Sequence, residues 1–448
     1  MFWYNSVVFL WRKPIMFQQV LFGDSIIVPI ILFVITYIFL LAIPKYRQYI
    51  ALGSALVFIV LGLLPIKLVL GTLDWNVLLM ILGTMGIVSL FIESKMPMLL
   101  ADKIINRVPN VKWAIISLAL LSGIISAFVD NVSTVLMLAP IALTMAKKLK
   151  ISPVPIVIAI VISSNLQGAA TLVGDTTSIM LGKEAGLDFF DFFFFQGRIS
   201  IFWFVEAGAF ASILFLLWLF RKEKQSIAQH EETVVKDYFP SILLLLMIGL
   251  LIVASFIPNK PHETNGYICL GLFLIGLIYK FGKTQSINSL KSNFKEIDFY
   301  TIILLISLFI IIGALEYRGV IVKIGELISK IGGGNIFLIY TVIVWFSVLV
   351  SAFIDNIPYV IMMLPVVTNI AGNLGIAPYV LYFGLLIGAT LGGNMTPIGA
   401  SANITGIGIL QREGYEVKTK TFMKIGVPFT LVAVITGYLL NWLFWYII

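Results

Sequence analysis

Three carboxylates stand in stretches of the sequence where nearly every other residue is apolar. Asp130 is followed by Asn131, Asp355 is followed by Asn356, and Asp175 lies in a short run of glycine, threonine and serine. Such residues can coordinate Na⁺ or hold a proton, so they are candidate ion-binding groups. Asp and Asn are also favoured helix N-caps, because their side chains accept hydrogen bonds from free backbone N–H groups. Both roles stay open on the sequence alone.

Hydroxyls, amides and glycines gather at two further places. Glycine lets the backbone unwind and approach a ligand, and the N–H groups that begin the next helix can receive an anion. Small residues also permit close helix packing in membranes, and Gly392 and Gly393 are interpreted in that way. Close packing does not require hydroxyl, amide or acid groups, so the residues that carry them are candidate binding residues. They are Thr171, Asp175, Thr396 and Asn403, with Gly174, Thr176, Gly399 and Ser401 beside them.

These residues belong to an internal repeat. Ser126–Asn131 recurs 225 residues later as Ser351–Asn356, and Thr171–Gly174 recurs at the same displacement as Thr396–Gly399. The two motifs are therefore 45 residues apart in both halves. A common displacement makes coincidence improbable and indicates two structurally related halves.

The elements that carry these residues are predicted to cross a lipid bilayer. Of 448 residues, 60% are hydrophobic and only 12% are charged, and the mean hydropathy is +1.04. One span needs about 20 residues, so the length allows about 10 spans plus 2 hairpins. The sequence predicts an all-α polytopic membrane protein of a bacterial or archaeal plasma membrane, with the bilayer as its surroundings.

Four apolar runs are longer than one span and are interrupted by polar residues, glycine or proline. Such breaks are tolerated at membrane depth only where the backbone is buried in protein or lines an aqueous cavity. We therefore expect two re-entrant hairpins at about 113–146 and 335–370, and two broken helices at about 153–182 and 377–410. The predicted organisation is an N-terminal interfacial segment at 1–23, repeat 1 at 24–220, a cytoplasmic linker at 221–238 and repeat 2 at 239–448.

The distribution of positive charge predicts how the repeats are oriented. If both hairpins leave on the side they entered, 21 of the 30 Lys and Arg residues fall on one side, which is then the cytoplasmic side. The first hairpin enters from the cytoplasm and the second from outside, so the repeats are inverted. Inverted repeats with broken helices are typical of secondary transporters, whose site lies near the bilayer midplane.

Composition excludes several other kinds of protein. The net charge of +8 sits in short loops, so we expect no nucleic-acid partner. The single cysteine, Cys269, excludes an internal disulfide framework, and His230 and His262 fall in charged connections. No phosphate-binding G-x-x-x-x-G-K-[ST] loop is present. We expect no cofactor apart from Na⁺ or H⁺ as a coupling ion, and no enzymatic activity.

Three strings resemble the ion transporter superfamily of divalent-anion and citrate carriers, arsenite permeases, the P protein and one class of sodium/proton antiporters. They are S-A-F-V-D-N-V-S-T from Ser126, S-A-F-I-D-N-I-P from Ser351 and G-G-N-M-T-P-I-G-A-S-A-N from Gly392, and the arsenite permease and P protein branch is most similar. The resemblance implies a homodimer that works as an elevator. It also implies sodium and substrate sites at Asp130, Asn131, Ser133, Thr134, Gly174, Asp175, Asp355, Asn356, Gly399, Ser401 and Asn403.

At the first break this branch often has G-D-P-P-N, whereas the present chain has Gly174-Asp175-Thr176-Thr177-Ser178. The threonine-rich form is more similar to the sodium/proton antiporters. Two functions therefore stay open, an ion-coupled transporter of a small carboxylate or oxyanion and a Na⁺/H⁺ antiporter.

Two other classes of membrane protein could contain aspartates or helix breaks of this kind. An intramembrane aspartyl protease would need a second glycine before Gly174-Asp175, but position 172 is leucine; a passive channel could also use mirrored helix breaks. A fourth membrane acid, Glu206, has no acidic counterpart in the other half and is interpreted either as a proton site or as a hydrogen-bonded structural residue.

Overall fold

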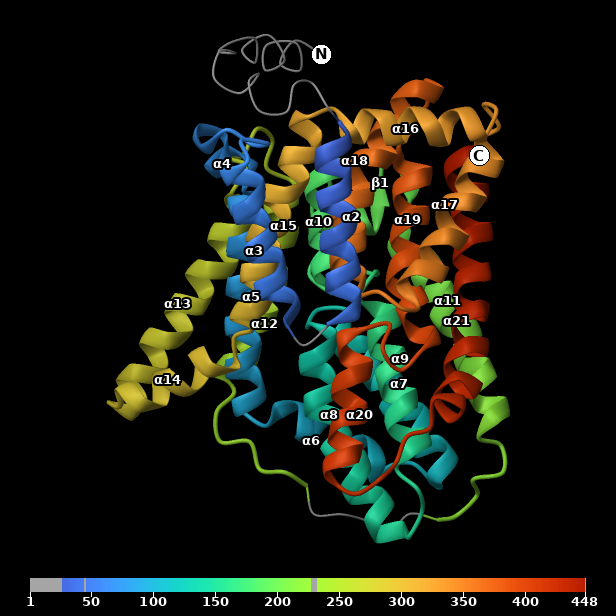
Figure 1. Cartoon of the computed structure of the whole chain (residues 1–448). Coiled ribbons are helices and arrows are strands. Elements are labelled where there is room, and N and C mark those ends of the chain that lie inside the picture. The colour runs from blue at the N-terminus through green and yellow to red at the C-terminus, as the bar shows by residue number, and fades with distance from the viewer. Residues whose placement is uncertain (1–25, 44–45, 227–231, 448) are drawn as a thin grey trace. The chain divides into compact units, whose positions relative to one another are not determined.

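The structure, a computed structural model, describes residues 26–43, 46–226 and 232–447 and is mainly α-helical (Figure 1). The predicted interfacial segment, residues 1–23, lies outside the described residues. Within the described part, six helices are long and apolar enough to cross a membrane, and eight shorter apolar helices accompany them. The chain is therefore a polytopic helical membrane protein, as its composition predicts.

Two compact units make up the chain. The first contains the described part of residues 1–73 together with Ile303–Lys323. Within it the Thr36 and Ser54 hydroxyls are 2.5 Å apart, and Arg318 donates to the carbonyl oxygen of Gly62 at 2.6 Å. Its helices are α2 (Ile27–Ala42), α3 (Arg47–Val60), α4 (Ile66–Thr72), most of α15 (Phe299–Tyr317) and the start of α16 (Val320–Ile331).

The second unit contains the remaining described residues and all the predicted site residues. Its elements are α5 (Trp75–Glu93), α6 (Met96–Ile105), α7 (Val111–Ser126), α8 (Asn131–Leu149), α9 (Val154–Gln167), α10 (Thr176–Ala185), η2 (Phe190–Phe192), β1 (Phe194–Phe195), β2 (Arg198–Ile199), α11 (Ile201–Leu219), α12 (Phe239–Ser255), α13 (Thr264–Thr284), α14 (Ile287–Glu296), α17 (Ile336–Ser351), α18 (Asn356–Leu374), α19 (Tyr379–Gly392), η3 (Gly393–Met395), α20 (Ser401–Arg412), α21 (Thr419–Trp442) and η4 (Leu443–Ile447).

Four of the predicted long runs each form two helices joined by a short non-helical segment. Helices α7 and α8 are joined by residues 127–130, which we call the first turn, and α17 and α18 by residues 352–355, the second turn. Helices α9 and α10 are separated by residues 168–175, which we call the first break, and α19 with η3 is separated from α20 by residues 396–400, the second break. Each break and the helices on both sides of it form a broken segment. In Figure 1, α9 and α20 lie in the lower half, and α10 and α19 in the upper half, so the two broken segments run in opposite directions.

Side-chain caps explain where several of these helices begin. Asp130 Oδ1 accepts a hydrogen bond from Ser133 N at 2.9 Å, and Asp355 Oδ1 accepts one from Ile357 N at 3.2 Å. Asn110 and Asn335, also 225 residues apart, cap α7 and α17 in the same way. The capping role expected for Asp130 and Asp355 is therefore present, and both carboxylates keep a second oxygen for another partner.

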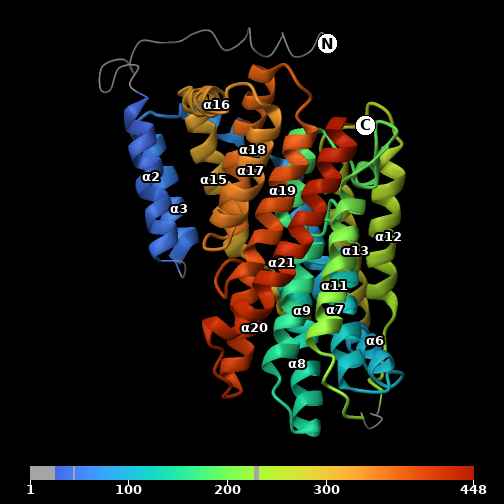
Figure 2. The same cartoon turned by 90° about the vertical axis from the view of Figure 1, so that its right-hand side faces the viewer.

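Close helix packing connects the elements that carry the site. Helix α7 packs on α9, α17 on α19, α9 on α20 and α10 on both α18 and α19. Figure 2 shows α7, α8 and α9 together in the lower part of this unit, with α17, α18 and α19 above them. The two turns and the two breaks consequently belong to the same bundle, and Phe353 of the second turn and Ile398 of the second break are exposed on it.

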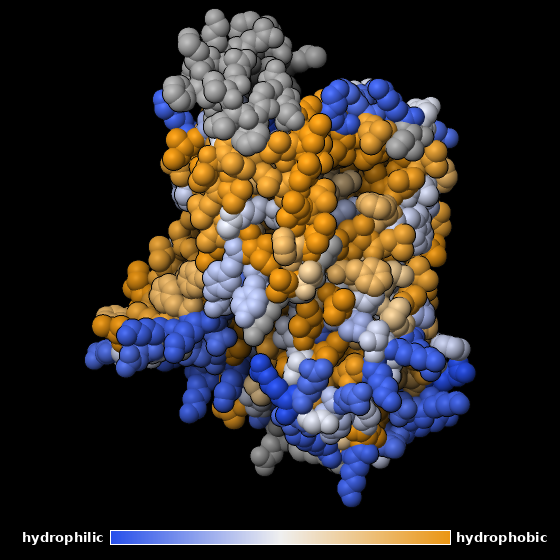
Figure 3. Space-filling model, in the orientation of Figure 1, coloured by the Kyte–Doolittle hydropathy of each residue, from blue (hydrophilic) through white to orange (hydrophobic). Residues whose placement is uncertain are grey.

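A short polar helix, α14, borders the long helices. Hydrophilic side chains gather over α14 in Figure 3, and Lys291 and Lys295 are exposed there. The aromatic stretch Phe189–Phe195 forms η2 and β1, and β1 pairs antiparallel with β2. Phe189 and Phe192 are buried, so part of this stretch belongs to the core.

Candidate functional site

Each turn is hydrogen-bonded to the break that follows it in the same half of the chain. The Thr171 hydroxyl donates a hydrogen bond to the carbonyl oxygen of Ala127, and the Thr396 hydroxyl donates one to the carbonyl oxygen of Ala352. These two bonds join residues related by the same displacement of 225. They explain why a threonine recurs at this place, since it holds the turn and the break in one arrangement.

In the first half, the turn lies over the start of the break. Asn131 Oδ1 accepts a hydrogen bond from the Ser126 hydroxyl at 2.7 Å, and the backbone oxygen of Asn131 accepts one from Ser164 at 3.1 Å. A Cβ at Gly168 would lie 2.9 Å from Asn131 Nδ2, so glycine is needed for this approach. The Thr134 hydroxyl is buried without a hydrogen-bond partner in the described residues.

In the second half, the corresponding turn binds the start of α20. The Ser401 hydroxyl donates to Asp355 Oδ2 at 2.6 Å. Ser401 corresponds to Thr176, which begins α10 and donates its backbone N–H to Asp175 at 2.7 Å. Helix α10 thus begins at a carboxylate of its own break, Asp175. Helix α20 begins at a carboxylate of the neighbouring turn, Asp355.

Asp175 joins the two halves. Its Oδ2 accepts hydrogen bonds from Asn356 Nδ2 and from the Thr177 hydroxyl, both at 3.0 Å. Thr177 in turn lies 3.2 Å, hydroxyl to hydroxyl, from Thr390 of α19. Asp355 directly precedes Asn356 in the chain. A carboxylate of the first break and an amide of the second turn therefore form one cluster.

Three buried amides form a second connection between the halves. Asn165 Nδ2 donates to Asn394 Oδ1 at 2.9 Å and to Asn403 Oδ1 at 2.7 Å. Asn403 Nδ2 donates to the carbonyl oxygens of Gly393 and Thr396. Asn165 and Asn394 are missing from the sequence-derived candidates because Thr390 and Ala169 occupy the repeat-related positions. An amide inside an apolar run is the signal that could have found them.

Both predicted break glycines lie against backbone oxygens. A Cβ at Gly399 would lie 2.5 Å from the Gly393 oxygen and 2.8 Å from the Ala352 oxygen. A Cβ at Gly174 would lie 3.0 Å from the Gly168 oxygen and 3.2 Å from the Ala127 oxygen. Backbone oxygens therefore crowd the glycine of each break, which leaves no room there for a side chain.

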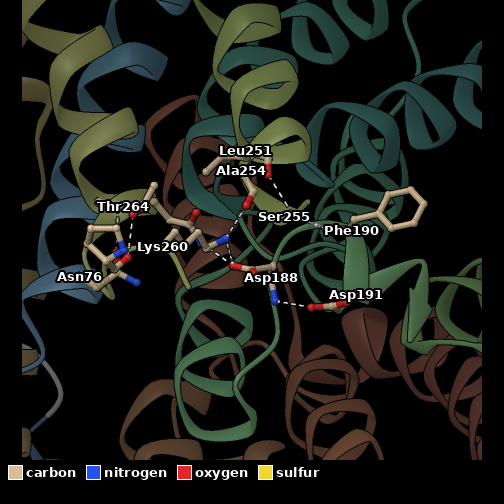
Figure 4. Close-up of polar contacts among 12 residues, drawn as sticks. Asn76, Asp188, Phe190, Asp191, Leu251, Ala254, Ser255, Lys260 and Thr264 are labelled. Atoms are coloured by element: carbon tan, nitrogen blue, oxygen red, sulfur yellow. Dashed lines mark hydrogen bonds and ion pairs between the residues drawn. The ribbon is translucent and has the colours of Figure 1, made fainter. Parts of the chain in front are cut away.

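The Asp188 cluster, beyond the end of α10, fixes the loop that follows this helix (Figure 4). Asp188 Oδ1 forms an ion pair with Lys260 at 2.6 Å, and Lys260 also donates to the Ala254 oxygen. Asp191 accepts the backbone N–H of Asp188 at 2.7 Å, and burial raises the pKa of Asp191 despite this hydrogen bond. The cluster anchors the first broken segment to the α12–α13 connection.

Comparison with protein families matches almost the whole chain. Residues 30–282 and 270–448 match the sequence profile of CitMHS, a family described as citrate transporter. An uncharacterized transporter of Mycobacterium tuberculosis is 29% identical over 381 residues, which cover 84% of this chain and 87% of that protein. The human P protein is 27% identical over 453 residues, covering 82% of this chain and 53% of its own length.

Two solved structures have a similar fold. The YdaH transporter of Alcanivorax borkumensis superposes with a TM-score of 0.58 at 14% identity and covers 84% of this chain and 87% of its own. MtrF of Neisseria gonorrhoeae, described as illuminating a class of antimetabolite efflux pumps, has a TM-score of 0.53 at 15% identity and covers 82% and 80%. The likeness is one of fold.

Proposed function

This chain belongs to the citrate transporter family, and from that premise we propose that it is a secondary active transporter that couples a small carboxylate or oxyanion to Na⁺ or H⁺. The family match and the transporter relatives support membrane transport. The observation that carries the coupling is the cluster at Asp175, where an acid from one half accepts a hydrogen bond from Asn356 of the other.

The cations in this proposal bind at two related positions. The first is formed by Asp130, Asn131 and Gly174, and the second by Asp355, Asn356 and Gly399. Each position offers carboxylate and amide oxygens together with the backbone oxygens that crowd the glycine. Oxygen ligands of this kind, at the ends of broken helices, suit a monovalent cation.

The anion in this proposal is held by the bound cations and by the starts of α10 and α20. Among the described residues, the ion pairs of the structure do not include Asp130 or Asp175, so no lysine or arginine neutralises these acids. Bound cations would reverse the local charge, and the free N–H groups of a helix start favour a negative ligand. Empty cation sites would repel the anion, which makes its binding depend on the cation.

The proposed mechanism is an elevator in a homodimer of inverted repeats. The two turns and the two breaks are connected by hydrogen bonds of Thr171, Thr396, Asp175 and Asn165. Elements joined in this way can move as one body, and the opposite directions of the two broken segments support the inverted arrangement. The remaining helices would then form the scaffold.

The Na⁺/H⁺ antiporter remains the second candidate, and the lack of an ion-pair partner for Asp175 among the described residues favours it. In that mechanism Na⁺ and H⁺ compete for the same carboxylate. The two functions predict different responses to the anion, because an antiporter moves protons in its absence.

Flux measurements in proteoliposomes decide between them. The purified full chain is reconstituted with an internal pH dye, and Na⁺ jumps and pH jumps are applied with and without each member of a panel of labelled carboxylates and oxyanions. Uptake of one anion that depends on either jump, with no Na⁺-driven proton movement in the absence of the anion, supports the anion carrier. Proton movement driven by Na⁺ alone would support the antiporter instead of the anion carrier. The absence of both responses would contradict both functions.

A further inference from the structure

A cavity of about 200 Å³ lies at one end of the helices α5, α12 and α13, apart from the proposed ion sites. These three helices pack on one another within the second unit. Helix α5 ends at Glu93, α12 begins at Phe239 and α13 ends at Thr284, and all three residues line the cavity. Because α5 and α13 are long and apolar enough to span a bilayer, the cavity lies where these spans meet water.

The most buried charge in the lining of this cavity is the ammonium group of Lys280, whose side chain is only 9% exposed. It donates hydrogen bonds to Glu93 Oε2 at 2.5 Å and to Asn293 Oδ1 at 2.6 Å. Asn293 belongs to α14, at the lower end of α13 in Figure 1, and it also donates to Glu93 Oε2 at 3.1 Å and to the Ser89 hydroxyl at 3.2 Å. An ammonium group has three N–H donors, and the described residues give it two acceptors. One N–H is therefore left for a ligand in the cavity.

The other charged groups of the lining are more exposed. Lys283 forms an ion pair with Asp237 at 2.7 Å, and the Lys283 side chain is 50% exposed. Both oxygens of Asp237 already accept hydrogen bonds, from Phe239 N and Tyr279 at Oδ1 and from Lys283 at Oδ2. The Glu93 side chain is 51% exposed, and its hydrogen bonds within the described residues all use Oε2. The cavity therefore offers two ammonium groups and one open carboxylate oxygen, with a net charge of zero.

This balance of charge indicates the kind of ligand. A simple anion would meet two ammonium groups but would also lie beside two carboxylates, which repel it. A zwitterion matches the cavity better, since a phosphate can accept hydrogen bonds from Lys280 and Lys283 while a primary ammonium donates to Glu93 Oε1. A quaternary ammonium has no N–H to donate. The charges therefore favour a phosphate ester of ethanolamine over a purely anionic or a choline-bearing molecule.

Apolar surface continues from the cavity along α12 and α13. The rings of Phe239 and Tyr279 stack with their centroids 3.9 Å apart and join the two helices at the cavity. Ile242 and Leu246 follow Phe239 at helical spacing on α12, and Ile275 lies one turn before Tyr279 on α13; all three are exposed. Tyrosine is enriched at the membrane–water boundary, because its ring is apolar and its hydroxyl is polar. A molecule with its headgroup in the cavity can thus place an acyl chain along these side chains.

We propose that this cavity binds a phospholipid with a phosphoethanolamine headgroup, on the side of the membrane that the charge distribution predicts to be cytoplasmic. The phosphate lies at Lys280 and Lys283, the ammonium at Glu93, and an acyl chain against Ile242 and Ile275. Pockets with basic groups between membrane helices are suited to lipid headgroups. This site does not depend on the proposed function, since it uses none of the residues of the turns or the breaks.

Native mass spectrometry of the full chain, purified in detergent, tests lipid binding directly. Phosphatidylethanolamine, phosphatidylcholine and phosphatidylglycerol with the same acyl chains are added in turn at equal concentration. We expect phosphatidylethanolamine to bind about ten-fold more tightly than the other two, because they lack the charged hydrogen bond to the carboxylate. Equal binding of all three lipids, or a preference for either of the other two, would overturn the proposal.

Two substitutions separate the two ends of the headgroup. Glu93→Gln removes the carboxylate that receives the ammonium and leaves two lysines with one acid, so the preference should change to phosphatidylglycerol. Lys283→Gln removes a phosphate contact and should weaken the binding of phosphatidylethanolamine. Lys291→Gln is the matched control, because Lys291 is exposed on α14 and does not line the cavity. Equal lipid binding by Lys283→Gln and Lys291→Gln would contradict the phosphate contact even if Glu93→Gln failed to fold.

Soluble phosphoethanolamine distinguishes a lipid from a small molecule of the same charge. At a concentration equal to that of the lipid, we expect it to leave the bound lipid in place, because it has no acyl chain to bury. Displacement of the lipid under these conditions would identify a site for a soluble zwitterion and overturn the lipid site. None of these measurements requires transport, so failure of the proposed function and failure of this inference give different results.

Discussion

Asp175 is the residue on which the two halves of the molecule depend most directly. It receives hydrogen bonds from its own helix start, from Thr177 and from Asn356 of the other half. Asp175→Asn would keep the shape of the side chain but remove its charge and replace one acceptor oxygen by a donor. The Asn356 amide would then face another amide N–H or require reorientation.

We expect Asp175→Asn to weaken cation-dependent transport by about ten-fold or more, since a hydrogen bond to a charged group contributes about 1.5–3 kcal/mol. The measurement is the initial rate of transport as a function of Na⁺ concentration in proteoliposomes. Asp237→Asn, in the linker before α12, is the matched control and should behave as wild type. Equal Na⁺ dependence in the Asp175 variant and wild type would contradict a role of the Asp175 cluster in coupling.

Asn165 is expected to contribute to stability as well as to the alignment of the breaks. Asn165→Leu leaves the Oδ1 atoms of Asn394 and Asn403 without this donor in a fully buried place, so we expect a loss of about 1–3 kcal/mol in the free energy of unfolding. Thermal denaturation in detergent measures it. Asn373→Ala, which removes an exposed amide bond to Asn369, should change the stability little. Similar melting of both variants would contradict the buried role.

At the scale of elements, backbone oxygens lie close to the glycine of each break, and more closely at the second break than at the first. Gly399 and Gly174 occupy equivalent places, but the added Cβ would be 2.5 Å from its nearest oxygen in the first case and 3.0 Å in the second. A contact below 3.0 Å with backbone requires the backbone to move. The second break is therefore expected to be the less tolerant of the two.

Alanine substitution tests this order. Gly399→Ala should abolish most transport, Gly174→Ala should reduce it partly, and Gly408→Ala in α20, whose Cβ would meet nothing within 4 Å, should leave it unchanged. Initial transport rates, normalised to the amount of reconstituted protein, give the comparison. If Gly399→Ala transported as well as Gly408→Ala, the close packing of Gly399 against backbone oxygens would not be needed for transport.

The start of α12 is expected to respond to acid. Burial opposes ionisation of Asp237, but hydrogen bonds from Lys283 and from Phe239 N outweigh it and lower the pKa of Asp237. Its stabilising effect is therefore present above the ordinary aspartate pKa of about 3.9 and is lost as the pH falls through the lowered value.

Hydrogen exchange of the first turn of α12 measures this effect. At neutral pH we expect faster exchange in Asp237→Asn than in wild type, with the difference disappearing as acid protonates Asp237 in the wild type. A difference that stayed constant down to the lowest pH would contradict the assigned sign.

At the scale of the whole molecule, the repeat displacement predicts which residues perform equivalent tasks. The bonds of Thr171 and Thr396, and the caps formed by Asp130 and Asp355, follow from it because equivalent sequences meet equivalent neighbours. Contacts between the halves could not be predicted in this way. Asp175 with Asn356, and Asn165 with Asn394, join positions that repeat comparison does not relate. Their pairing depends on how the helices pack in space.

The proposed inverted arrangement leads to a test at the same scale. If the two cation positions are equivalent, Asp130→Asn and Asp355→Asn should each reduce the steepness of the Na⁺ dependence of transport, and the double variant should remove the dependence altogether. Transport by both single variants with the wild-type Na⁺ dependence would contradict a paired site.

The proposed function requires that ion movement is coupled to transport of an anion. The most direct test is accumulation of labelled citrate and related small anions in proteoliposomes under an inward Na⁺ or H⁺ gradient. We expect one anion to accumulate above its external concentration, and this accumulation to collapse when an ionophore dissipates the driving gradient. Uptake that only equilibrates, at a rate independent of either gradient, would show a passive pathway and contradict the claim.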